Sequence, residues 1–152
     1  MKVLIIGLLI FLLYASGASA TMSTTDEEFE LISAEDLGYT IIPAKSSDNE
    51  VAVRTVYDTI TQGEVNWHGK TVSTYIESLN VDLNWGDSSN SLRLTIYDPN
   101  NHCIGTFYDS DDGKTDDGRI NLYVRNSSGI EQGTWRYMVY GYSVSGTEDY
   151  SI

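Results

Sequence analysis

The second half of the chain alternates apolar and polar residues with a period of two. Apolar side chains occupy every second position in residues 79–85, 92–97, 120–125 and 135–140. Because successive side chains of a β-strand point to opposite faces, each stretch predicts a strand with one buried and one exposed face. Trp85 and Trp135 fall on the apolar faces, so we expect both in the core.

Weaker patterns predict further strands at residues 51–57, 64–68, 71–76, 103–108 and 149–152. Clusters of Gly, Asn, Asp and Ser separate the strands, as is typical of turns. Eight or nine short strands over roughly 100 residues predict one all-β domain at residues 51–152. The expected fold is an antiparallel β-sandwich with a jelly-roll or Greek-key-like strand order.

Residues 1–20 have the layout of a secretory signal peptide. Lys2 precedes an apolar run at residues 3–14, and small residues end the segment at Ala18-Ser19-Ala20. The run is shorter than the ~20 residues that span a bilayer. We therefore predict cleavage before Thr21, a secreted or cell-surface location, and no membrane span afterwards. An uncleaved anchor is the alternative.

Residues 21–50 form an acidic leader. They hold eight acids and only Lys45, a net charge of −7. This composition is typical of a solvated linker. The alternative is that one of two apolar islands, at residues 29–32 and 39–43, is a strand that docks on a sheet edge of its own chain or of a neighbour.

Charge and residue usage exclude several functions. The 22 acidic and 9 basic residues give a net charge of −13, or −14 once Lys2 is lost with the signal peptide, which disfavours nucleic acid and anionic lipid as partners. One cysteine excludes an internal disulfide framework. No G-x-S-x-G motif is present, and His68 and His102 are expected to be surface residues near loops. A non-enzymatic protein is therefore expected.

The strongest candidate metal site is an acidic loop at residues 109–118. Calcium prefers six to eight oxygen ligands, and a short loop of acids with glycine at the bend suits it. The loop therefore predicts a Ca²⁺ site, and the alternative is a solvated acidic turn. The candidate ligands are Asp109, Asp111, Asp112, Asp116 and Asp117.

A second candidate site is aromatic. Tyr97, Tyr123 and Tyr140 are the outward members of three alternating strands. Exposed aromatic rings stack on the apolar faces of sugars, so a carbohydrate surface is one interpretation. Ordinary cross-strand pairing is the other. Asn126, in the run Asn126-Ser127-Ser128, is a candidate glycosylation acceptor in a turn.

Three segments resemble a known family. Residues 92–101 (LRLTIYDPNN), 133–141 (GTWRYMVYG) and 146–152 (GTEDYSI) resemble the bacterial and archaeal pre-peptidase C-terminal domain, over Ile60 to Ile152. Asn101 replaces the commoner Gly of that pattern, and Trp135 the commoner Tyr. The resemblance implies an antiparallel β-sandwich that accompanies a secreted peptidase. With no peptidase in this chain, a stand-alone extracellular module is expected.

Together these observations predict a secreted, non-enzymatic β-sandwich with a binding or structural role, stabilised by calcium if the acidic loop binds it. One alternative is a self-assembling surface or filament subunit whose leader inserts as a strand into the next copy. Another is a carbohydrate-binding domain. The expected partners are an extracellular protein, a polysaccharide or a second copy.

Overall fold

The computed structural model describes residues 33–44, 55–114 and 116–152. The predicted signal peptide, the apolar island at residues 29–32 and much of the acidic leader lie outside these residues. Within the described ranges the only helix is the four-residue 3-10 helix η1 (Asp109–Asp112), and no helix is long and apolar enough to cross a membrane.

Nine antiparallel strands make up most of the described chain, which confirms the all-β prediction. They are β1 (Thr40–Pro43), β2 (Tyr57–Thr61), β3 (Val65–Val72), β4 (Ser78–Asn84), β5 (Ser91–Tyr97), β6 (Cys103–Phe107), β7 (Arg119–Arg125), β8 (Gly133–Ser143) and β9 (Thr147–Ser151).

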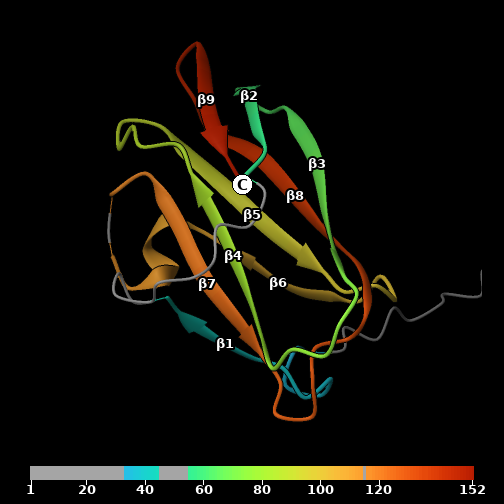
Figure 1. Cartoon of the computed structure of the whole chain (residues 1–152). Coiled ribbons are helices and arrows are strands. Elements are labelled where there is room, and N and C mark those ends of the chain that lie inside the picture. Colours follow the sequence, from blue (N-terminus) through green and yellow to red (C-terminus); the bar gives the residue numbers. More distant parts are fainter. Residues whose placement is uncertain (1–32, 45–54, 115) are drawn as a thin grey trace, which may run out of the picture.

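The strands form two sheets that pack as a sandwich (Figure 1). Sheet A has the order β1-β7-β4-β9-β2, and sheet B has the order β3-β8-β5-β6. With β1 set aside, each sheet has four strands in the order of an eight-stranded jelly roll. Most connections pass from one sheet to the other, so residues close in sequence often belong to different layers.

The core lies between the sheets and consists of the apolar members of the alternating strands. Leu83, Leu94, Ile120 and Val139 are fully buried. Trp85 and Trp135 are buried as expected. Trp135 packs edge to face against Tyr39, and the centroids of these two rings are 5.4 Å apart. Burial of these side chains supplies the main driving force for the sandwich.

The four strongly alternating stretches all form strands, with ends within three residues of those predicted. The strand bounds predicted from the weaker patterns are less accurate. Residues 64–68 and 71–76 were expected as two strands, but β3 runs through Gly69 without a break. This strand lies at the edge of sheet B, and Asn66, His68 and Lys70 occupy its inward positions, so its alternation is hard to recognise.

The second apolar island of the leader is a strand of the sandwich. β1 pairs antiparallel with β7 of the same chain, from Thr40 opposite Arg125 to Pro43 opposite Leu122. Tyr39, directly before β1, enters the core. Of the two readings of this segment, the docked strand is therefore the one found, and it covers the edge of β7 that would otherwise be open.

Candidate functional site

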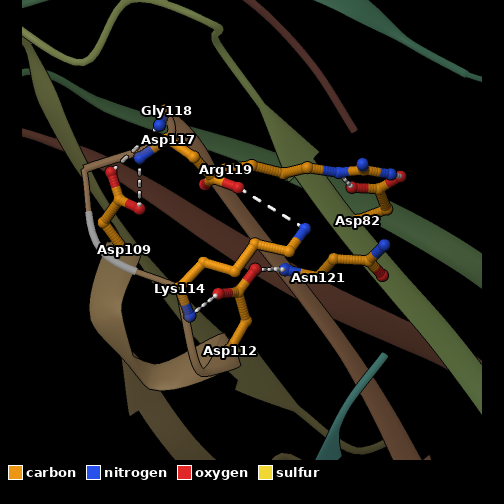
Figure 2. A network of polar contacts seen from close by, with 8 residues as sticks. All are labelled: Asp82, Asp109, Asp112, Lys114, Asp117, Gly118, Arg119 and Asn121. Atoms are coloured by element: carbon orange, nitrogen blue, oxygen red, sulfur yellow. Dashed lines mark hydrogen bonds and ion pairs between the residues drawn. The ribbon is translucent and has the colours of Figure 1, made fainter. Parts of the chain in front are cut away.

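The acidic loop connects β6 of sheet B to β7 of sheet A, and two of its carboxylates turn inward (Figure 2). Asp109 accepts hydrogen bonds from the backbone N–H groups of Asp117 (3.3 Å) and Gly118 (3.1 Å). Asp112 accepts them from the N–H groups of Lys114 (3.0 Å) and Asn121 (3.2 Å). Both aspartates are buried.

The other loop carboxylates are more exposed. Asp111 accepts a hydrogen bond from the N–H of Tyr108 at 2.8 Å, and Asp117 lies 3.5 Å from the Lys114 ammonium. Asp116 is exposed and has a positive φ of 55°. Burial raises the pKa of Asp109, backbone hydrogen bonds lower it, and the neighbouring acids raise it further.

These contacts explain why the crossover between the sheets is acidic. Where the chain crosses from one sheet to the other, its backbone no longer pairs with a neighbouring strand. Its N–H groups therefore need other acceptors. Asp109 and Asp112 supply them. In the described part of the chain, no group of three or more His, Cys, Asp or Glu side chains is arranged to hold a metal ion. Calcium binding by this loop stays a prediction.

The internal role of Asp109 leads to a test. We expect Asp109→Ala to lower the free energy of unfolding by about 1–3 kcal/mol, because two backbone donors lose their acceptor. Urea unfolding in EGTA measures this loss alone, and if the loop binds calcium as predicted, the loss in millimolar Ca²⁺ should be larger. The matched control is Asp149→Ala, which removes the same charge at an exposed position of β9 and should change little. No loss in EGTA would show that Asp109 is not needed as an acceptor, and equal losses in the two buffers would contradict calcium binding through Asp109.

The three tyrosines predicted to share a face do not do so. Tyr97 in β5 and Tyr140 in β8 lie on the outer face of sheet B, both half-buried. Tyr123 in β7 belongs to sheet A and is only 4% exposed, with the Arg125 guanidinium 5.3 Å from its ring centroid. The prediction that one aromatic surface includes all three tyrosines is therefore wrong for Tyr123. Alternation within a strand does not show which sheet the strand joins.

Sheet B nevertheless carries an aromatic surface, which includes Trp67 of β3. Trp67 is 51% exposed, and its ring centroid lies 5.6 Å from that of Tyr97. The Arg93 guanidinium lies 4.5 Å from the centroid of the Tyr140 ring. We name eight of the outward side chains of this sheet the aromatic face: Val65, Trp67, Arg93, Tyr97, Arg136, Met138, Tyr140 and Tyr142.

A polar cluster between β2, β3 and β9 was missed by sequence reasoning. His68 was expected near a loop surface, but its side chain is only 9% exposed, and its Nε2 lies 2.6 Å from the Tyr150 hydroxyl. Asp58 lies 3.8 Å from the imidazole. Burial lowers the pKa of His68, against the opposing effect of Asp58, and burial raises the pKa of Tyr150 to about 12. The three residues come from separate strands, so their spacing in sequence gave no signal.

The candidate glycosylation acceptor lies in the turn after β7. Asn126 is half-buried, and its Oδ1 accepts a hydrogen bond from the N–H of Ser128 at 2.9 Å. Its side chain also lies close to Gly38, where a Cβ would be 3.4 Å from Nδ2. Ser127 and Ser128 are exposed. Modification of Asn126 stays a prediction.

Comparison with known proteins gives a relative for part of the chain. No family model matches the chain, so the resemblance to the pre-peptidase C-terminal domain stays a prediction. An "Uncharacterized protein" of Archaeoglobus fulgidus is 42% identical over 50 residues, which are 33% of this chain and 70% of the archaeal protein. The chain therefore belongs to the same family as this archaeal protein.

Proposed function

We propose that the protein is a secreted, non-enzymatic binding module and that the aromatic face of sheet B binds carbohydrate. The observation that carries the proposal is the exposure of Trp67 beside Tyr97 on an open sheet surface. Large aromatic side chains are normally withdrawn from water, and an exposed group of them marks an interaction site. Secretion is supported by the layout of residues 1–20.

The shape and chemistry of the surface favour a sugar chain over a small ligand. The aromatic side chains come from neighbouring strands of an antiparallel sheet and so lie on one broad surface. Rings on such a surface offer stacking sites to successive sugar units, and the arginines beside them offer hydrogen-bond donors to hydroxyl groups. A small-molecule site would instead need a deep and enclosed pocket.

The proposal is tested by measuring the affinity of the chain from Thr21 for a panel of soluble polysaccharides. We expect at least one polysaccharide to bind, and Trp67→Ala to weaken that binding about tenfold, since ring contacts contribute on the order of 1 kcal/mol beyond buried area. Affinity electrophoresis gives the ratio of the dissociation constants of the wild-type protein and Trp67→Ala directly.

The matched control is Tyr57→Ala, which removes a side chain that is 83% exposed on β2 of sheet A. It should leave affinity unchanged, and circular dichroism should show both variants folded. Absence of binding to every polysaccharide, or equal binding by the wild-type protein and Trp67→Ala, would refute the proposal.

A further inference from the structure

The distribution of charge over the two sheets is uneven. None of the 22 acidic residues lies in β3, β5, β6 or β8, the four strands of sheet B. Sheet A carries Asp58, Asp82, Glu148 and Asp149 in its strands. The outward positions of sheet B hold two arginines, Arg93 and Arg136. In a chain of net charge −13, the aromatic face is thus locally basic.

Arg136 lies between the rings of Trp67 and Tyr97 on the aromatic face. Trp67 in β3 and Tyr97 in β5 lie on either side of β8, and the Arg136 guanidinium is 5.4 Å and 5.7 Å from their ring centroids. One of its amino groups donates a hydrogen bond to Asn101 Oδ1 at 2.6 Å. A guanidinium has five N–H donors, so this contact leaves donors for a ligand.

A guanidinium held between rings suits a ligand that is both ring-shaped and anionic. The planar fork of arginine matches a carboxylate with two parallel hydrogen bonds. The adjacent Trp67 and Tyr97 rings offer apolar surface to the sugar ring that bears this carboxylate. We propose that the aromatic face binds an acidic polysaccharide built of uronate units, with Arg136 pairing to the carboxylate. This inference rests on the proposed function and specifies its ligand class.

Charge also argues against the other occupants of this face. An isologous contact with a second copy would bring two Arg93 and two Arg136 side chains together, and the strands of sheet B hold no carboxylate to pair with them. A nucleic acid would need many phosphate contacts, and two arginines on a strongly acidic protein do not supply them.

The test compares polygalacturonate with its fully methyl-esterified form, which has the same backbone without the charge. We expect the wild-type protein to bind the acidic form at least tenfold more tightly in 50 mM salt. Arg136→Gln should abolish this preference, and Arg136→Lys, which keeps the charge but loses the fork, should retain part of it. Lys114→Gln, which removes a cation from the acidic loop, is the control and should keep the full preference.

The outcomes separate this inference from the proposed function. If Arg136→Gln keeps the preference, or if the wild-type protein binds both forms equally, the uronate assignment fails while carbohydrate binding through Trp67 stands. If Lys114→Gln loses as much as Arg136→Gln, the preference is diffuse electrostatics and the assignment also fails. Equal affinity for poly-glutamate would show an acidic-protein surface instead. If the protein binds neither form of polygalacturonate but does bind another polysaccharide, the uronate assignment fails and carbohydrate binding stands.

Discussion

Replacing Leu122 with aspartate is expected to unfold the protein. Leu122 lies in β7 with β1 on one side and β4 on the other, and its side chain is 1% exposed. The substitution removes a buried leucine and places a carboxylate where no partner exists. The two effects together cost about 5 kcal/mol or more, which is comparable to the whole stability of a small domain.

Far-UV circular dichroism and urea unfolding would measure this loss. The matched control introduces the same side chain at Thr134, an exposed position on the outer face of β8. Thr134→Asp forfeits its hydroxyl contact with Thr71 and should cost at most about 1 kcal/mol. Similar stability of the two variants would show that the assignment of inner and outer faces is wrong.

Gly141→Ala is expected to produce the second large loss of stability. Gly141 in β8 lies under the turn that joins β2 to β3, where its carbonyl accepts a hydrogen bond from the N–H of Gly63 at 2.9 Å and its own N–H donates to the Glu64 carbonyl at 3.1 Å. A Cβ at this position would lie 2.1 Å from the Thr61 carbonyl oxygen. The obstacle is backbone, so the turn itself must move.

Displacing that turn should lower the free energy of unfolding by about 1–3 kcal/mol or more, measured by urea unfolding. The control is Gly69→Ala in β3, where the nearest atoms to a new Cβ are 3.4 Å away and φ is not in the left-handed region. Its effect should be small by comparison. An unchanged midpoint for Gly141→Ala would mean that the turn does not pack on β8 as described.

The fold was largely predictable because strand alternation is a local property. In residues 120–125, for example, Ile120, Leu122 and Val124 mark the inner face, and all three are buried. The weak point was β3. Gly69 there suggests a turn, and the inward His68 and Lys70 break the apolar pattern. An edge strand has less apolar surface to bury, so its sequence carries a weaker signal.

The candidate sites were less predictable, since they depend on contacts between distant segments. The five acids of residues 109–117 were identified as a group, but their spacing did not reveal that Asp109 and Asp112 point at backbone donors. Trp67 falls within the weak strand pattern at residues 64–68. The contact between Trp67 and Tyr97 across β8 could not be predicted, because the two residues are thirty positions apart in the chain.

In the strongly alternating strands the sequence alone therefore determined which side chains face inward and which face outward, because a period of two follows from the backbone geometry of each strand. Only the tertiary structure decided which outward side chains share a surface. Tyr97, Tyr123 and Tyr140 have the same local pattern, yet β5 and β8 belong to sheet B and β7 to sheet A. Sheet membership is set by long-range strand pairing and by the packing of the whole core, which no single segment encodes.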